Sequence, residues 1–194
     1  MIAEAVAVSY VAMQVITNTM PVGRAPQRFI SVIEPRGGKR IFAEDSDAVM
    51  TLSFDEVSPC MWSTRNEYDS VVKDFSRRGT NFTVFDQKHA DSIIDFVLRA
   101  QACERAETLY VNCALGVARS GAIVRFIADV LSLDEASFRE LNSHIEPNQH
   151  VFCMLHKRWT ERWLSNVFGQ QAQGNLADDP IAHCQCGHAY SQND

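Results

Sequence analysis

One stretch decides the fold of this 194-residue chain: Leu109-Tyr110-Val111-Asn112-Cys113-Ala114-Leu115-Gly116-Val117-Ala118-Arg119-Ser120-Gly121. Its apolar first part, which ends at Val111, is typical of a short buried strand. The five residues between Cys113 and Arg119 predict a tight loop, because Gly116 in the middle allows a sharp turn or a close approach to a ligand. The apolar run at 122–131 then predicts a helix. A strand, a loop and a helix therefore follow one another here.

Further strands and helices alternate on the N-terminal side of this stretch. Phe29–Ile33, Arg40–Phe42 and Val49–Phe54 predict strands, and Ile2–Ile16 predicts either a strand or a first helix. The residues from Pro35 to Gly38 predict a turn. Asp86 is a candidate N-cap for a helix that runs to Ala102. The alternation indicates an α/β fold with a central, mixed or mostly parallel sheet flanked by helices.

Two other parts of the chain differ from this pattern. Residues 58–85 predict an irregular segment with one helical turn around Tyr68–Phe75, and long irregular segments are typical of lids or binding elements. On the C-terminal side, Asp134 is a candidate cap for a helix through Leu141, and Val151–Phe168 predicts a last long helix. We therefore expect one domain over residues 1–168 and a polar tail over 169–194.

Composition limits the classes of function. Hydrophobic residues make up 46% of the chain, which is enough for a core, and the formal net charge is −6. An acidic chain argues against a general nucleic-acid binder, because the phosphate backbone favours clustered Lys and Arg. No apolar run is long enough to span a membrane. No Lys or Arg precedes Arg24, so a secretory signal is not expected, and we expect a reduced, cytoplasmic setting.

The loop between Cys113 and Arg119 has the features of an anion site. Successive backbone N–H groups of a strand-to-helix loop converge on one point, and the helix dipole adds positive potential there. Arg119 adds a planar, bidentate donor that suits two phosphate oxygens. The same field favours the thiolate of Cys113 and lowers its pKa. The segment therefore predicts a sulfur nucleophile beside a bound oxyanion.

These residues resemble the signature of cysteine-dependent protein tyrosine phosphatases of the small, dual-specificity-like kind. That signature is His-Cys, five residues, then Arg-Ser or Arg-Thr, and Cys113 through Ser120 matches all but its first position, where this chain has Asn112. The resemblance extends from about Phe29 to Trp163. It includes the Glu146-Pro147-Asn148 turn. It implies a phosphatase-like α/β fold with the phosphate loop between a strand and a helix.

The resemblance also implies a role for each matching residue. Cys113 would form a cysteinyl-phosphate, Arg119 would bind the phosphoryl group, and Ser120 would donate a hydrogen bond to the sulfur. The backbone N–H groups of the loop would form the substrate cradle, which comprises Ala114, Leu115, Gly116, Val117, Ala118 and Arg119. Asp55, at the end of a strand, is the first candidate for the general acid. Glu56, Asp69 and Asp86 are the alternatives. We expect Asn112 to alter the thiol pKa modestly without abolishing activity.

The expected function is hydrolysis of phosphate monoesters, with phosphotyrosine in proteins as the first substrate and phosphoserine or phosphothreonine as further ones. The loop side chains carry no charge, whereas relatives that act on phosphoinositides tend to carry Lys there. Neither a metal nor an organic cofactor is expected. Two alternatives stay open: a phosphate-binding module without catalysis, and a phosphatase that acts on RNA 5′ ends or nucleotides. The oligomeric state is not determined by the sequence.

The remaining cysteines have simpler interpretations. Cys60, Cys103 and Cys153 are interpreted as small packing residues. The segment from His183 to His188 offers four possible zinc ligands in six residues. Structural zinc sites usually draw ligand pairs from separated segments, so a metal-free tail is the favoured interpretation.

Overall fold

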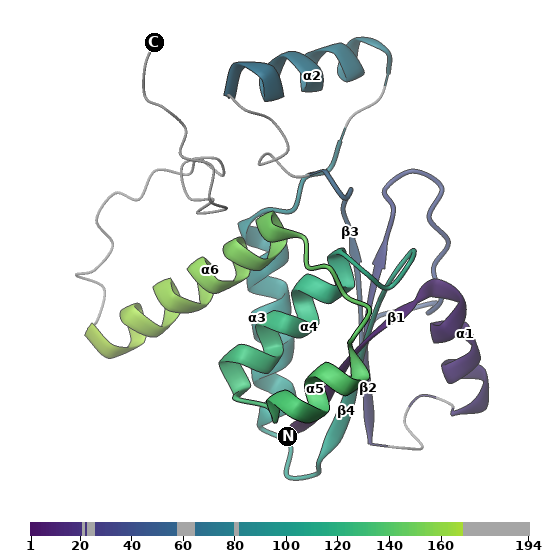
Figure 1. Cartoon of the computed structure of the whole chain (residues 1–194), viewed down its shortest axis with the longest axis vertical. Helices are drawn as coiled ribbons and strands as arrows, with labels where there is room; N and C mark the ends of the chain where they lie inside the picture. Colours follow the sequence, from purple (N-terminus) through teal and green to yellow (C-terminus); the bar gives the residue numbers. More distant parts are fainter. Residues whose placement is uncertain (21, 23–25, 58–64, 80–81, 169–194) are drawn as a thin grey trace.

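A parallel four-stranded sheet forms the centre of the molecule, in the strand order β1-β4-β2-β3 (Figure 1). The computed structural model describes residues 1–168 except 21, 23–25, 58–64 and 80–81. The strands are β1 (Ile2–Ser9), β2 (Gln27–Ile33), β3 (Val49–Ser53) and β4 (Glu107–Cys113). The helices are α1 (Tyr10–Thr19), α2 (Arg65–Arg77), α3 (Gln87–Gln101), α4 (Arg119–Leu131), α5 (Glu135–Leu141) and α6 (Gln149–Phe168). The expected α/β class is confirmed, and the described sheet is wholly parallel.

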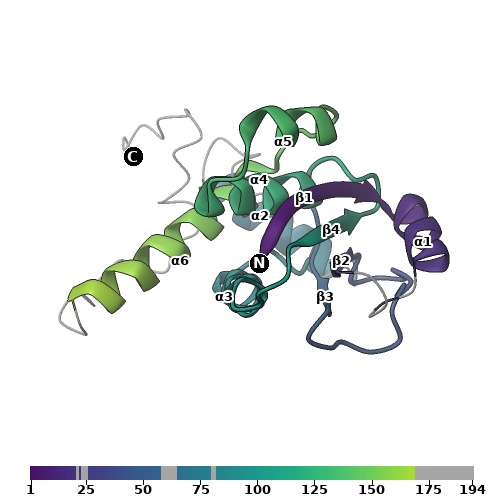
Figure 2. The ribbon, with the colours of Figure 1, turned by 90° about the horizontal axis from the view of Figure 1, so that it is seen from below.

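Helices cover the two faces of the sheet unequally, as Figure 2 shows. On one face α1 buries Met13 against Phe29 and Val49 of the strands. On the other face α3 and α4 form the larger core, in which Ile93 and Ile123 are fully buried. Helix α6 packs against both α3 and α4. Strands buried on both faces explain the nearly continuous apolar runs in the sequence.

Local sequence signals set several helix boundaries. The Asp86 carboxylate accepts a hydrogen bond from the His89 backbone N–H at 3.0 Å, so Asp86 caps α3 as predicted. The Asp134 carboxylate caps α5 in the same way, through the Ser137 N–H at 2.8 Å. Each side chain satisfies an N–H group that the first helical turn leaves without a partner.

Three sequence predictions need correction or refinement. Residues 40–42 do not form a strand: 41 and 42 lie in a bend, and Phe42 is buried against the Phe29 ring at 5.3 Å between centroids instead of pairing in the sheet. The helical turn expected around 68–75 is the thirteen-residue helix α2, whose Phe75 contacts the Phe82 ring. The stretch Ile2–Ile16 divides into β1 and α1, with the Ser9 hydroxyl capping the helix.

The strand register brings the site residues to one edge. Ser9 lies opposite Cys113, so β1 and β4 end together. Ile33 and Ser53 are paired in the same way at the ends of β2 and β3. All four strands are parallel, so the segments that follow them meet at their carboxyl ends, where ligands of open α/β sheets commonly bind.

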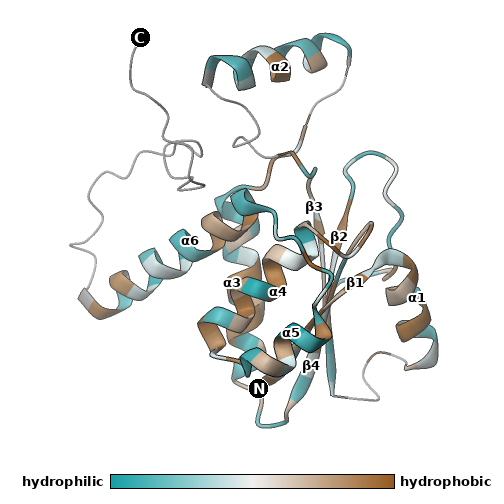
Figure 3. Cartoon of the chain, viewed as in Figure 1, coloured by the Kyte–Doolittle hydropathy of each residue, from teal (hydrophilic) through white to brown (hydrophobic). Residues whose placement is uncertain are grey.

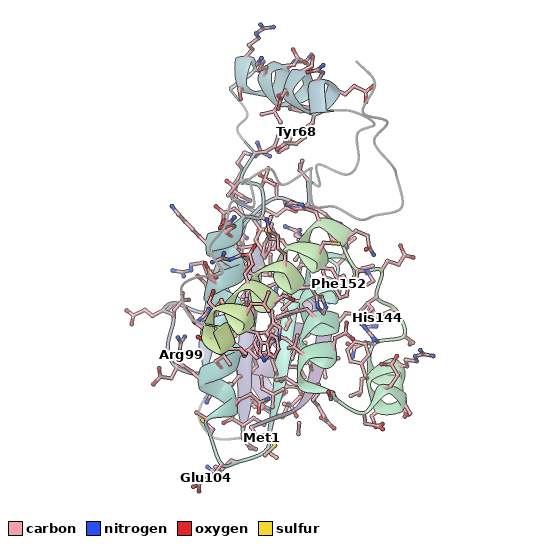
Figure 4. The ribbon with its side chains drawn as sticks, turned by 90° about the vertical axis from the view of Figure 1, so that its left-hand side faces the viewer. Met1, Tyr68, Arg99, Glu104, His144 and Phe152 are labelled. Carbon is pink, nitrogen blue, oxygen red and sulfur yellow. The ribbon has the colours of Figure 1, made fainter. Side chains whose placement is uncertain are left out.

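Two findings concern the outer parts of the molecule. Figure 4, with Tyr68 labelled on α2 and Phe152 on α6, shows α2 apart from the helices that pack on the sheet. None of the helices in the described residues is long and apolar enough to cross a membrane. Cys60, the tail at 169–194 and the possible zinc ligands of His183–His188 lie outside the described residues.

Candidate active site

The loop between β4 and α4 lies against the junction of β1 and α1. The Tyr10 N–H donates to the Ala114 carbonyl at 3.2 Å. Gly116 has φ +80°, and a Cβ there would lie 2.5 Å from the Val8 carbonyl carbon and 2.6 Å from the Ser9 nitrogen. Both the left-handed backbone and the lack of space therefore require glycine at this position. The loop is held in shape by the neighbouring strand.

Cys113 lies at the end of β4 and is only 2% exposed. Its Sγ is 3.3 Å from the Ser120 hydroxyl oxygen, and either atom can be the donor. Burial raises the pKa of the Cys113 thiol. Hydrogen bonds from the Ser120 hydroxyl and from the Ser120 and Gly116 N–H groups, together with the charge of Arg119, outweigh burial, so this pKa is lowered overall. A lowered pKa makes the sulfur more nucleophilic near neutral pH, because more of it is thiolate.

Arg119 is the first residue of α4, and its side chain is 1% exposed. Its Nη1 donates to the Phe54 carbonyl at 3.0 Å, and its Nη2 donates to Glu34 Oε1 at 3.2 Å. Among the described residues, Nε has no hydrogen-bond acceptor. The nearest carboxylate oxygen to Nε, Glu56 Oε2, is 3.7 Å away, so this donor can still form a hydrogen bond to an oxyanion.

Two carboxylates approach this guanidinium from different strands. Glu34 follows β2, and Glu56 lies just beyond β3, with its Oε2 3.7 Å from Arg119 Nε. Both side chains are more than half exposed. Glu34 was not predicted as a site residue, because it is 85 positions from Arg119 and only the order of the strands brings the two together.

Asp55, unlike Glu56, is largely buried and has a partner at each of its carboxylate oxygens. One Asp55 oxygen accepts from the Thr83 N–H at 2.8 Å, and the other pairs with Arg36 at 3.3 Å. The Asp55 side chain is 11% exposed. Its backbone N–H also donates to the Thr83 carbonyl, so the two segments are joined by two hydrogen bonds. Asp55 thus fastens the segment after β3 to the segment before α3.

The other two acid candidates belong to helix α2 and to the N-terminal end of α3. Asp86 is engaged as the α3 N-cap, where the His89 backbone and ring lie against its carboxylate. The pKa of Asp86 is lowered although burial raises it, because hydrogen bonds and charge from His89 outweigh burial. Asp69 lies on α2. Neither is among the carboxylates that the structure brings to Arg119.

The turn from Glu146 to Asn148 supports the loop from behind. The Glu146 N–H donates to the Val117 carbonyl at 3.3 Å, and the Asn148 N–H donates to the Ala118 carbonyl at 3.1 Å. The Asn148 amide also donates to the Glu56 carbonyl at 3.2 Å. Asn148 therefore links the loop to the segment that carries Glu56. The sequence pointed to this turn but not to its contacts.

Asn112 points away from the thiol, on the α1 side of the sheet. Side chains alternate along a strand, so Asn112 shares a face with Tyr110, which packs in the α1 core, and Cys113 lies on the opposite face. Asn112 is fully buried, and neither of its amide atoms has a partner among the described residues. Ser31, its neighbour on β2, also has a buried hydroxyl without a partner there. This pair is an energetically costly part of the sheet.

Cys103 and Cys153 occupy half-buried positions, as free thiols. The Arg28 guanidinium donates to Cys103 Sγ at 2.9 Å, so Cys103 makes a polar contact in addition to its packing contacts. Burial raises the pKa of Cys153. The pKa of Cys113 is therefore shifted in the opposite direction from that of Cys153.

The described residues contain no group of three or more His, Cys, Asp or Glu side chains arranged to hold a metal ion. Comparisons with models of known protein families, with curated proteins and with solved structures found no match. The function therefore has to be argued from the geometry at Cys113 and Arg119.

Proposed function

We propose that the chain is a cysteine-dependent phosphatase that hydrolyses phosphate monoesters, phosphotyrosine of proteins first among them. The observation that carries the proposal is the pairing of a buried thiol of lowered pKa with a buried guanidinium across one tight loop. The thiol of Cys113 supplies a nucleophile, and Arg119 supplies charge for the equatorial oxygens of a transferring phosphoryl group. Neither step requires a metal or an organic cofactor.

The reaction proceeds in two steps in this proposal. The Cys113 thiolate attacks phosphorus, the phosphorus–oxygen ester bond breaks, and an acid gives its proton to the leaving oxygen. Water then attacks the cysteinyl-phosphate, the sulfur–phosphorus bond breaks, and the carboxylate accepts a proton from the water. Inorganic phosphate leaves and the thiolate is restored. The Ser120 hydroxyl, 3.3 Å from the sulfur, stabilises this thiolate as a leaving group.

The contacts favour Glu56 over Asp55 as the acid. A general acid must be free to exchange its proton with substrate and water. Both oxygens of Asp55 are engaged, by Thr83 and Arg36, whereas the Glu56 carboxylate is 54% exposed and lies beside Arg119. Asp55 is then an anchor of this segment, and its role as the acid stays an alternative.

Turnover of an aryl phosphate and of a phosphotyrosine peptide, measured beside the Cys113→Ser variant, tests the proposal. We expect turnover in the wild-type protein and loss of it in the variant, which lacks the nucleophile. Turnover by Cys113→Ser at the wild-type rate would contradict the mechanism. Phosphate binding without turnover in the wild-type protein would favour a non-catalytic binding module. Comparing RNA 5′-phosphate and nucleotide substrates in the same assay tests the remaining alternative.

The acid is identified with three matched variants. We expect Glu56→Gln to slow an ester with a poor leaving group by about 100-fold or more and an activated aryl ester much less. Glu34→Gln is the control, because Glu34 also contacts Arg119. Asp55→Asn should mainly lower stability. If Asp55→Asn alone shows the dependence on leaving group, Asp55 is the acid.

A further inference from the structure

A cavity of about 420 Å³ lies beside the candidate active site, at the carboxyl end of β2. Tyr10 and Val11 of α1 line one side, and Ile33 with the segment 34–39 lines the other. Ala114, the first residue of the loop, also borders it. Volumes of this size are typical of sites that hold a small molecule or part of a larger ligand.

The cavity adjoins the candidate active site, but the candidate acids do not line it. Glu34 borders the cavity and also accepts a hydrogen bond from Arg119, so an occupant lies close to a phosphoryl group held in the loop. Neither Asp55 nor Glu56 is among the residues that line the cavity. The leaving oxygen must meet one of these acids. A different part of the substrate therefore occupies the cavity.

The surface around the cavity is apolar where α1 borders it. Val11 is 66% exposed, and Leu115 at the tip of the loop is 76% exposed. Figure 3 shows hydrophobic residues along α1. Val15, one turn further along this helix, is also exposed but is not among the residues that line the cavity. Apolar side chains of this size that are exposed together mark surfaces that bind a partner.

The opposite rim carries charged side chains and has a fixed shape. The Gly38 N–H donates to the Glu34 carbonyl at 3.2 Å, and a Cβ at Gly38 would overlap the Glu34 backbone. This turn places Glu34, Arg36 and Lys39 on the cavity. Arg36 is paired with Asp55 and Glu34 with Arg119, so the rim carries charges of both signs that already have partners. An apolar wall beside a rim of charged side chains suits a side chain of a polypeptide rather than an isolated phosphate group.

We infer that the cavity is a subsite for a large apolar side chain, one or two residues from the phosphorylated residue of a polypeptide substrate. The inference rests on the proposed function. An extended peptide advances about 3.4 Å per residue, so a neighbouring side chain reaches a cavity that adjoins the phosphate loop. The subsite distinguishes polypeptide substrates from one another and leaves small aryl phosphates unaffected.

A series of phosphotyrosine peptides tests the inference. Each peptide carries one Leu at one of the four positions nearest the phosphotyrosine, in a background of Ala and Ser. We expect Leu at one position to raise kcat/KM about tenfold, equivalent to about 1.4 kcal/mol. The gain should disappear in Val11→Asp, which places a charge on the cavity wall. It should remain in Val15→Asp, the matched control on the same helix.

The outcomes separate the subsite from the proposed function. Turnover of a small aryl phosphate reports on the function alone and should be equal in the wild-type protein and both variants. The inference is overturned if no Leu position matters, if the gain survives Val11→Asp, or if Val15→Asp removes it equally. If the wild-type protein turns over no ester, the peptides are titrated onto Cys113→Ser by fluorescence anisotropy. A preference for one Leu position then supports the subsite, and equal affinities overturn it.

Discussion

Replacing Gly116 by alanine tests whether the loop between β4 and α4 packs as the structure describes. Two separate penalties act at this position. A non-glycine residue at φ +80° loses about 1–2 kcal/mol of stability to left-handed strain. The added Cβ would also lie 2.5 Å from the Val8 carbonyl carbon and 2.6 Å from the Ser9 nitrogen. Both are backbone atoms of β1 and its junction with α1, so they cannot rotate away.

The second penalty, the steric contact of the added Cβ, would be absent at a glycine that faces solvent. Relieving the contact requires the loop or the end of β1 to move, and overpacking of this kind costs about 1–3 kcal/mol. The sum for Gly116→Ala is about 2–5 kcal/mol, a large part of the 5–15 kcal/mol by which domains are usually stable. The same shift moves the N–H group of residue 116 away from the Cys113 sulfur, so the thiol pKa should rise.

Gly37→Ala is the matched control. Gly37 has φ +75°, and a Cβ there meets no atom within 4 Å, so only the backbone strain of about 1–2 kcal/mol applies. Urea unfolding of both variants gives the difference between them, and aryl phosphate turnover gives the functional effect. We expect Gly116→Ala to be the less stable variant by about 1–3 kcal/mol and to lose most activity. Equal losses of stability in the two variants would refute the packing of the loop on Val8 and Ser9.

Three further predictions follow from buried groups. Alkylation of Cys113 should have a pH midpoint below the usual value of about 8.5, because a lowered pKa keeps the thiolate at lower pH. Ser120→Ala should raise that midpoint, because it removes a hydrogen bond that lowers the pKa of Cys113. Cys153, whose pKa is raised by burial, serves as the internal reference. An unchanged midpoint would contradict a stabilisation of the thiolate by the Ser120 hydroxyl. Asn112→Val should raise the free energy of unfolding by about 1–3 kcal/mol, because it removes a buried amide that has no partner among the described residues. A lower free energy of unfolding than that of the wild-type protein, measured in urea, would disprove this. Burial lowers the pKa of His150 despite its hydrogen bond to a carbonyl, so the native state favours the neutral ring. Stability should therefore fall as the pH drops through the unfolded-state value of about 6.5, and urea unfolding of His150→Gln across this range should show a weaker dependence.

The buried polar pair of Asn112 and Ser31 lies next to Cys113 in the sheet but on the opposite face. A residue one position from Cys113 cannot contact the thiol directly through its side chain, because successive side chains point to opposite faces. Asn112 can act on Cys113 through the backbone of β4. The Asn112→Val variant therefore separates a stability effect from an effect on the thiol.

Short-range patterns predicted much of the fold. Apolar runs located β2, β3 and β4, and the carboxylates of Asp86 and Asp134 marked the starts of α3 and α5. These signals lie within a few residues of the structures they specify, so the sequence alone contains them. The helix α2 was underestimated, because its polar composition resembles that of the segments around it.

The chain order of Cys113, Gly116 and Arg119 was sufficient to predict a thiol and a guanidinium on one loop, because a strand, a tight turn and a helix start are local features. The carboxylates around Arg119 were decided by the tertiary structure. Glu34 and Glu56 reach Arg119 because β2 and β3 run parallel to β4 and end at the same edge. Hydrogen bonding between strands, not spacing along the chain, sets that register, and it also forms the cavity between α1 and residues 34–39.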